Sequence, residues 1–455
     1  MQFLHDAGWW QNAYRKLILT VCLGFSFHLL APAAFSMAQV VSTAPKAGSA
    51  SMDRSHPYQL PPDKQAKAEA LGNIRTALHF GSELWELALI TLFLASGIAS
   101  RIGRRISETV SKGWLQALLY SALLVILLYC VAELPPAAIS HAYSIRYGIS
   151  VQSWGSWLLD EAKTLALTVS LAAPTLTLIY GLMRWRWSRT RYWFWLWVGA
   201  VPVILLTAFV EPQVIEPMFD NFTPLAQTHP ALVQQLERVV ARTGTSIPPE
   251  RMFLMQASAK SNGLNAYVSG LGATKRVVVW DTTADRMPTD QILFIFGHES
   301  GHYVLNHIPK GLTLACLGLL VSFWLTSRLA DWLIRRYGRS WRIDLIASLP
   351  GLVVLLLAFA IFQTVSEPLQ NAVSRHFEHE ADVYGQEAMH GILPDPQKTA
   401  VDAFNTLGTA YLDNPDPSPF VEFWTYGHPS IQSRAKFAAQ YDPWPPGQTP
   451  KFFPR

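Results

Sequence analysis

The sequence predicts a mainly α-helical protein that crosses a membrane several times and carries a smaller α+β portion outside the bilayer. Of its 455 residues, 50% are hydrophobic and only 15% are charged, whereas soluble proteins carry about 25% charged residues. Six apolar runs approach the ~20 residues that a helix needs to cross the hydrocarbon core. Two segments of mixed composition, 211–310 and 367–455, lie outside these runs. This composition excludes a disordered chain and a single small soluble domain.

The charge balance and the cysteines narrow the possible partners. The net charge is only +4, and no basic cluster marks a soluble face, so we predict no nucleic-acid partner. The three cysteines, Cys22, Cys130 and Cys316, each lie inside an apolar run. They form neither a disulfide framework nor a CxxC zinc pattern. A bound metal therefore has to be held by histidines and carboxylates.

The first 38 residues have the order of a secretory signal. Arg15 and Lys16 precede an apolar stretch, and Ser36 and Ala38 supply the small residues of a cleavage site. We expect 1–38 to be a signal peptide or, alternatively, an uncleaved first membrane helix. The following residues, 39–80, are rich in Ala, Ser, Pro and Lys without a sustained period, which predicts an exposed linker leading into a short helix.

The apolar runs predict the membrane-spanning part of the chain. They lie at 84–100, 114–133, 164–184, 192–210, 311–333 and 345–366. The first four predict a transmembrane domain over 81–210, and the last two predict a transmembrane hairpin over 311–366. Glu83 and Glu86 are expected near the end of the first run, where water can reach them.

Positively charged loops orient these helices. The charges gather in three short loops, with Arg101, Arg104, Arg105 and Lys112 in the first, Arg184, Arg186, Arg189 and Arg191 in the second, and Arg335, Arg336, Arg339 and Arg342 in the third. Alternation of the spans puts all three loops on one side, which their excess of Lys and Arg marks as cytoplasmic. The segments 211–310 and 367–455 then face the non-cytoplasmic side, in agreement with an N-terminal signal.

The two outward segments are together long enough for one compact domain, which the transmembrane hairpin divides in the chain. A run of valines and a tryptophan at 277–280 follows a glycine-rich turn at 269–272. This pattern predicts a short hairpin or a three-stranded sheet within 251–283. The rest of both segments is expected to be mainly helical.

The strongest chemical signal is the sequence His-Glu-Ser-Gly-His at 298–302. Apolar residues on both sides predict a buried helix that starts near Thr289. His298 and His302 are four residues apart, so both imidazoles project from one helix face and suit two of the four tetrahedral positions of zinc. Glu299 is rotated off the metal axis and is placed to take a proton from an attacking water. This is the HExxH pattern of zinc proteases; the alternative is two ordinary histidines on a buried helix.

A third ligand is expected from the second outward segment. Glu378 and Asp382 are four residues apart and share a helix face, whereas Glu380 lies about 200° around the helix from Glu378. We predict Glu378 as the ligand and Asp382 as the acceptor that holds a zinc-bound histidine in its tautomer. The competing ligand candidates are His376 and His379, and the alternative for Asp382 is a surface charge.

These segments resemble the integral-membrane CAAX prenyl protease type I family of zincins. The resemblance runs in order over most of the chain. It is carried by 297–302 with His307; by Asn371, Ser374, Arg375, Glu378 and Asp382; by 215–225; by Ser261, Asn262, Asn265, Ala266, Tyr267 and Gly270 with Asp281, Thr282 and Thr283; by His428, Pro429 and Arg434; by 145–150; and by Asp160 with Lys163.

The resemblance implies a fold and a reaction. The fold is that of a polytopic membrane protein with an α+β zincin-like metallopeptidase domain that carries a small β-sheet. The first part of this domain, 211–310, holds the HExxH helix, and the second part, 367–455, holds the glutamate ligand. The reaction is peptide-bond hydrolysis by a membrane-embedded zinc metalloendopeptidase. Its expected partners are a membrane-associated peptide or protein substrate and the lipid bilayer.

The resemblance also implies roles for individual residues. These are His298, His302 and Glu378 as ligands of one zinc ion, Glu299 as general base, Asn265 and Ala266 as the substrate-binding edge strand, His428 as oxyanion donor, and Arg434 as the anchor of the His428 segment through a carboxylate. An edge strand suits a peptide substrate because it offers unpaired N–H and C=O groups. His307 is expected to be a structural hydrogen-bonding residue.

Two features depart from the family. The resemblance implies a site that faces the cytosol in eukaryotic members, whereas the charged loops of this chain place the site outside. A signal-like N-terminus also replaces an ordinary first span. Prenylated CAAX tails are made in the cytosol, so the sequence leaves the substrate open.

Two other classes of protein compete with an enzyme. The first is a membrane chaperone or assembly factor with a structural zinc and no peptidase activity. Glu299 argues against it, because a structural site closes its fourth position with protein and has no use for that carboxylate. The second is a transporter or channel, for which ionisable residues buried in the spans are expected. The central parts of these spans contain almost none.

Overall fold

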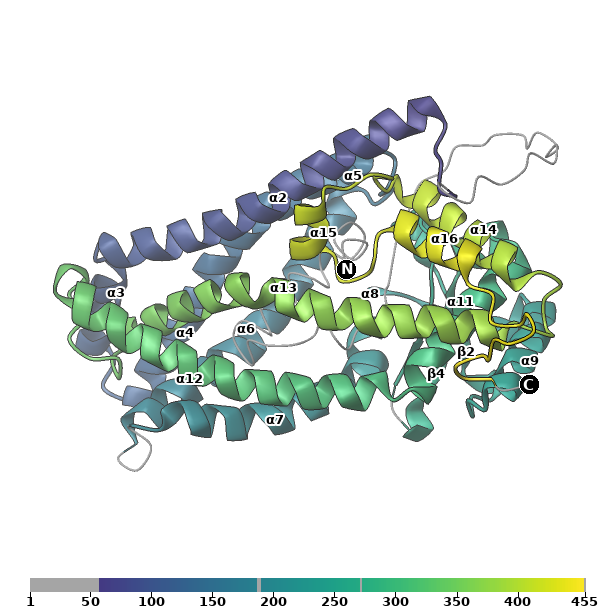
Figure 1. The fold of residues 1–455 in the computed structure, drawn as a ribbon. Helices are drawn as coiled ribbons and strands as arrows, with labels where there is room; N and C mark the ends of the chain where they lie inside the picture. Colours follow the sequence, from purple (N-terminus) through teal and green to yellow (C-terminus); the bar gives the residue numbers. More distant parts are fainter. Residues whose placement is uncertain (1–56, 186–189, 271, 454–455) are drawn as a thin grey trace.

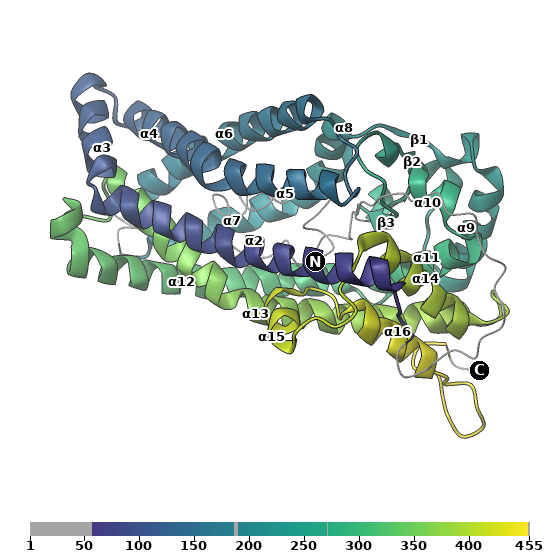
Figure 2. The same cartoon turned by 90° about the horizontal axis from the view of Figure 1, so that it is seen from above.

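The computed structural model describes residues 57–185, 190–270 and 272–453. The expected signal peptide or first membrane helix at 1–38 lies outside the described residues. Long helices form one end of the elongated molecule, and a sheet surrounded by shorter helices forms the other (Figure 1, Figure 2). The predicted fold class, a mainly α protein with a small sheet, is confirmed.

Six helical segments in the described part of the chain are long and apolar enough to cross a membrane. They are α2 (Pro62–Ala95); α4 (Gly113–Leu128) continued by a π-helical turn (Tyr129–Glu133) and α5 (Leu134–Arg146); α6 (Trp154–Arg184); α7 (Tyr192–Val210) continued by a π-helical turn (Glu211–Ile215) and α8 (Glu216–Phe219); α12 (His307–Trp341); and α13 (Leu349–Ala388). Each predicted apolar run overlaps one of these segments. A further helix, α3 (Ile98–Thr109), follows α2.

The first long helix begins earlier than predicted. The composition of 39–80 predicts a linker, whereas α2 already starts at Pro62. Proline favours a helix start because the first helical N–H has no partner within the helix. Ala68 and Leu71 of this early part pack into the cores at the sheet end of the molecule. One face of the first turns of α2 therefore packs on protein while most of their other residues are exposed, which is why no long apolar run marks them.

Helix α13 crosses the predicted boundary between the transmembrane hairpin and the second outward segment. It runs from Leu349 to Ala388 with Pro368 inside it. Its first half is an apolar membrane helix, and its second half enters the domain at the sheet end (Figure 1). The segment with the predicted glutamate ligand is therefore the continuation of a membrane helix.

The sheet has four strands in the order β1-β2-β4-β3. Their bounds are Phe222–Pro224 (β1), Met252–Met255 (β2), Ala266–Ser269 (β3) and Arg276–Trp280 (β4). The central pair, β2 and β4, is parallel, and both outer pairs are antiparallel. The prediction of two or three strands within 251–283 omits β1, which is too short to show an alternating pattern. Strand β3 forms one edge of the sheet, and this edge faces the site described below.

Shorter helices enclose the sheet. They are α9 (Pro230–Thr243), α10 (Asp281–Arg286), α11 (Thr289–Val304), α14 (Pro396–Tyr411), α15 (Pro419–Thr425) and α16 (Ile431–Gln440). Alternate residues of β4 point to opposite faces. Val277 and Val279 pack into the main core with Phe296 of α11, while Val278 packs on the other face with Tyr411 of α14. The sheet is thus buried on both faces, which fixes β3 relative to α11.

Candidate active site

Helices α11 and α13 cross at a distance that only glycine permits. A Cβ added to Gly385 of α13 would lie 2.8 Å from the backbone nitrogen of His298, and one added to Gly301 of α11 would lie 3.0 Å from Cβ of Tyr384. Helix α11 begins at Thr289, as predicted. The crossing brings residues of the HExxH motif next to the second half of α13.

The three predicted ligands converge at this crossing. The Nε2 atoms of His298 and His302 lie 3.2 Å apart. Glu378 Oε2 lies 3.3 Å from the first of these nitrogens, and its Oε1 lies 3.5 Å from the second. A tetrahedral zinc with bonds of ~2.0–2.1 Å separates its ligand atoms by about 3.3 Å. One donor atom of each of the three residues lies within 4.8 Å of the other two, which is close enough for all three to bind one metal ion.

Two further observations agree with a metal at this position. Glu378 Oε2 is buried and receives no hydrogen bond from the residues that the structure describes. A buried carboxylate oxygen without a donor is costly unless a cation satisfies it. Burial lowers the pKa of His302 to about 3, which keeps its imidazole neutral, the form that binds metal. The residues present therefore fit a divalent metal ion.

Asp382 holds the first histidine of the motif. Its Oδ1 lies 2.9 Å from Nδ1 of His298. Arg434 of α16 binds both oxygens of the same carboxylate, at 2.6 and 2.9 Å. Burial by itself lowers the pKa of His298, but hydrogen bonds to Asp382 and Glu378 outweigh it and raise that pKa to about 9. Arg434 thus contacts Asp382 most closely, behind the histidine. Its Nη2 also lies 3.4 Å from Nδ1 of His298 and 3.7 Å from Oε2 of Glu378, the latter beyond hydrogen-bonding distance.

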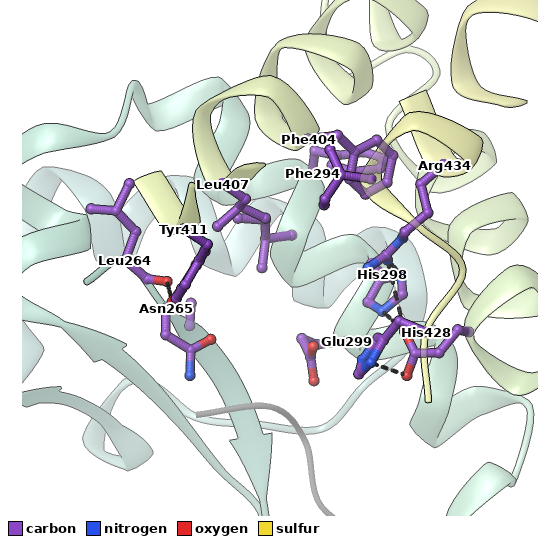
Figure 3. Close-up of a pocket in the computed structure, with 14 residues that line it drawn as sticks. Leu264, Asn265, Phe294, His298, Glu299, Phe404, Leu407, Tyr411, His428 and Arg434 are labelled. Carbon is purple, nitrogen blue, oxygen red and sulfur yellow. Dashed lines mark hydrogen bonds and ion pairs between the residues drawn. The ribbon is translucent and has the colours of Figure 1, made fainter. Parts of the chain in front are cut away.

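Glu299 lies in the pocket beside the three ligands (Figure 3). Its carboxylate is buried and accepts a hydrogen bond from the backbone of Val268 in β3. Burial raises the pKa of this carboxyl to about 7. A group with a pKa close to neutrality is suited to accept a proton in one step and release it in the next.

His428 comes from the loop between α15 and α16 and closes the pocket from the opposite side (Figure 3). Its Nε2 lies 3.2 Å from Oε1 of Glu378. Burial lowers the pKa of His428 to about 4, so at neutral pH the ring is uncharged and donates a single N–H. The structure thus places His428 within hydrogen-bonding distance of the predicted ligand Glu378.

The start of this loop is anchored by two residues of α13. The sequence alone assigns neither of them a role. Asn371 Nδ2 donates to the carbonyl of Trp424 over 2.5 Å. Arg375 Nη1, one turn further along, donates to the carbonyl of Tyr426 over 2.5 Å. Their i, i+4 spacing shows that they share a helix face, but only the tertiary structure shows what that face binds. The His428 segment is therefore anchored to the helix that carries Glu378.

The open edge of the sheet runs along the pocket. The carbonyl of Asn265 accepts a hydrogen bond from the backbone N–H of Trp280 and so faces β4. Because alternate residues of an antiparallel strand face opposite ways, the N–H and C=O groups of Ala266 point to the open side. The hydrogen bond between Val268 and Glu299 agrees with this register. Asn265 and Ala266 both line the pocket.

The pocket has an apolar wall between the edge strand and α14. It is formed by Leu264, Phe294, Ile295, Phe404, Leu407, Tyr411 and Ile431. In Figure 3 Leu407, Phe294 and Phe404 lie above Glu299, between Asn265 on one side and Arg434 on the other. The pocket thus combines an apolar wall with polar groups on both sides of it.

The competing ligand candidates lie elsewhere. His376 is mostly exposed, with Nε2 3.8 Å from Glu380, and His379 packs against the ring of Phe437. Glu380 itself is bound by Lys451 at 2.8 Å. None of these three is among the residues that line the pocket.

His307 supports the second histidine of the motif. Its Nδ1 lies 3.2 Å from Nδ1 of His302, and its Nε2 lies 3.4 Å from Glu380. The ring also stacks on Phe377 with a centroid separation of 4.6 Å. These contacts agree with the structural role expected from the sequence.

Comparison with known proteins gives matches over nearly the whole described chain. Residues 218–442 match the model of peptidase family M48, and residues 52–221 match the model of the CAAX prenyl protease N-terminal domain with five membrane helices. The metalloprotease YhfN of Bacillus subtilis is 31% identical over 85% of this chain and 88% of its own length. CAAX prenyl protease 1 of Saccharomyces cerevisiae is 26% identical over 67% of this chain and 68% of its own.

A solved structure shares the fold. The crystal structure of S. mikatae Ste24p superposes with a TM-score of 0.70 and covers 95% of both chains, at 20% sequence identity. The arrangement of membrane helices around the mixed α+β domain is therefore a known one.

Proposed function

The chain belongs to peptidase family M48 and is a multi-pass membrane metallopeptidase; we propose that it is a zinc metalloendopeptidase of the HExxH type. In this proposal it binds an extended, membrane-associated peptide and hydrolyses an internal peptide bond with Glu299 as the general base. The proposal goes beyond family membership in naming the metal, its ligands and the residues that move the proton.

The convergence of His298, His302 and Glu378 carries the proposal, because one donor atom of each lies within 4.8 Å of the other two, and two imidazoles with one carboxylate are the protein ligands of a catalytic zinc site. Zinc bound there supplies Lewis-acid polarisation of the scissile carbonyl and lowers the pKa of water. Asp382 accepts the Nδ1–H of His298 and thereby directs the lone pair of Nε2 toward the other two ligands.

Glu299 transfers the proton in this proposal. Its carboxylate accepts a proton from the attacking water and then delivers it to the nitrogen of the departing amine. The pKa of about 7 that burial gives this group supports both transfers. The backbone hydrogen bond from Val268 keeps the carboxylate beside the edge strand on which the peptide lies.

The edge strand positions the substrate. A peptide that pairs with Ala266 extends the sheet by one strand and runs past Glu299, since both groups line the same pocket. The apolar wall formed with Phe294 and Phe404 receives an apolar side chain. His428 donates its N–H to the oxygen of the scissile carbonyl as negative charge develops there.

The positively charged loops support an orientation for the reaction. The first and the third of them meet in space, because Ser100 Oγ of α3 donates to the backbone carbonyls of Trp341 and Arg342. These contacts lie at the end of the molecule opposite the sheet (Figure 1). Under the positive-inside rule this end is cytoplasmic and the active site is on the non-cytoplasmic side.

The decisive experiment replaces the general base and keeps the metal ligands. Glu299→Gln should retain zinc and lose cleavage of an unfolded substrate protein, because the amide cannot accept the proton. The matched control is Glu237→Gln, on the exposed face of α9, which should cleave like the unmodified chain. Zinc content and initial rate are measured on the same detergent-purified samples.

Two outcomes would contradict this function. Full activity of Glu299→Gln would exclude Glu299 as the base. A chain that binds zinc but cleaves no unfolded or membrane-anchored substrate would favour the alternative, a membrane chaperone or assembly factor with a structural zinc.

A further inference from the structure

A second group of ligand-type side chains lies among the membrane helices. His79 and Glu83 come from α2, and Glu367 comes from α13. Each offers a ligand atom, and these atoms all lie within 4.8 Å of one another. His79 Nε2 and Glu367 Oε2 are 3.1 Å apart. The sequence analysis places Glu83 at a solvent-accessible helix end, whereas the structure buries its Oε2.

The helices explain why the three side chains meet. His79 and Glu83 are four residues apart and therefore share one face of α2. Helices α2 and α13 are packed against each other; seen from above, α2 runs along α13 (Figure 2). Gln363 lies one turn before Glu367 on the same face of α13, and its Oε1 is buried without a hydrogen bond from the described residues.

The group combines buried oxygen donors with a deficit of positive charge. The side chains of His79 and Glu367 are 7% and 13% exposed. Glu83 Oε2 receives no hydrogen bond from any residue that the structure describes. Within the same residues, no lysine or arginine forms an ion pair with Glu83 or Glu367. Two carboxylates in such a place favour binding of a cation, because unpaired buried charge is strongly unfavourable.

We propose that His79, Glu83 and Glu367 bind a second divalent cation, through one imidazole nitrogen and two carboxylate oxygens. This mixed donor set suits a first-row metal ion such as Zn²⁺. The cation would fasten α2 to α13 and so brace the helix that carries Glu378.

The second site is separate from the HExxH site. Glu367 and Glu378 are eleven residues apart on α13, which is about 16 Å along a helix axis. No ion can bind both carboxylates directly over that distance. Each site can therefore be removed by variants that leave the ligands of the other intact.

The test counts bound zinc on the full-length chain in detergent. Protein is stripped with a chelator, reloaded with excess Zn²⁺, freed of unbound metal and assayed by mass spectrometry of the metal and by amino-acid analysis. We expect about two zinc ions in the unmodified chain and about one in Glu378→Gln, in which the HExxH site is disabled. The variant that combines His79→Ala with Glu83→Gln should also hold about one, and all three substitutions together should remove both.

A second readout is thermal stability. Zn²⁺ should raise the Tm of Glu378→Gln, because an ion that binds only the folded chain stabilises it. The rise should vanish when Glu367→Gln is added. Glu69→Gln, an exposed glutamate on α2, is the matched control and should keep both the zinc content and the rise.

The outcomes separate this site from the proposed function. An unmodified chain that saturates at one zinc, with none left in Glu378→Gln, overturns the second site. This comparison needs no substitution in α2, so misfolding of the α2 variants cannot obscure it. Loss of cleavage in Glu299→Gln with two zinc ions retained supports both proposals, whereas two zinc ions without any peptidase activity supports the second site alone.

Discussion

Nδ1 of His298 and Oδ1 of Asp382 lie 2.9 Å apart, on the side of the imidazole that faces away from Glu378. The carboxylate is itself held by two hydrogen bonds from Arg434. This chain of contacts fixes the tautomer and the orientation of the ring, so that Nε2 points at the other two ligands. The proposed metal site thus has an inner layer of ligands and an outer layer, Asp382 and Arg434, that orients them without binding the metal.

Asp382→Asn should weaken zinc binding without abolishing it. Loss of such an outer carboxylate typically lowers metal affinity about 10–100-fold, because the amide no longer stabilises the Nδ1–H of His298. Competition with a chromogenic chelator measures the affinity. The exposed Asp416→Asn is the control, and equal affinity in the two variants would contradict the role of Asp382.

Gly385→Ala should damage the site through packing alone. The added methyl would meet the backbone of His298 at 2.8–2.9 Å, and backbone atoms cannot move aside as a flexible side chain does. Overpacking of this kind costs about 1–3 kcal/mol, measured as a lower Tm together with a loss of bound zinc. Gly199→Ala on α7, where a Cβ meets nothing within 4 Å, should be neutral; a loss of similar size there would point to a general effect of alanine.

The sequence predicts those parts of the protein that short-range spacing encodes. The helix of His298 and His302 and the pairing of Glu378 with Asp382 both follow from a separation of four residues on a helix. The six apolar segments follow from composition and length. These features need no knowledge of how distant segments pack.

Other parts depend on long-range packing and could not be predicted. The contact of His79 with Glu367 joins residues 288 positions apart, and no periodicity encodes it. The early start of α2 and the short strand β1 are stabilised by neighbouring elements rather than by their own sequence. The same holds for Asn371, whose position on α13 is evident but whose partner, the carbonyl of Trp424, is not.

His428→Ala should lower kcat and leave zinc content and KM nearly unchanged. Removing one donor to a developing oxyanion typically costs about 10²–10³-fold in kcat, because the interaction forms only as charge develops. Steady-state kinetics on a fluorogenic peptide measures the two constants separately. His376→Ala serves as the control because this ring is mostly exposed. A rise in KM alone would instead assign His428 to substrate binding.

A scan of backbone methylation should reveal how the substrate binds. A peptide that adds a strand beside Ala266 directs alternate N–H groups to the sheet. N-methylation of successive residues of a cleaved peptide should therefore raise KM at every second position. A uniform effect along the peptide, or an effect confined to the scissile bond, would contradict strand addition.

The side of the membrane that carries the active site can be tested with single cysteines. The three native cysteines are replaced, and one cysteine is introduced either at Glu237, on the exposed face of α9, or at Arg104, on α3 at the opposite end of the molecule. The excess of Lys and Arg around α3 predicts that this end is cytoplasmic. In sealed vesicles with the native orientation, a membrane-impermeant maleimide should label the cysteine at 237 directly and the cysteine at 104 only after detergent is added. The reverse pattern would place the site in the cytoplasm, where a prenylated peptide tail would be an available substrate.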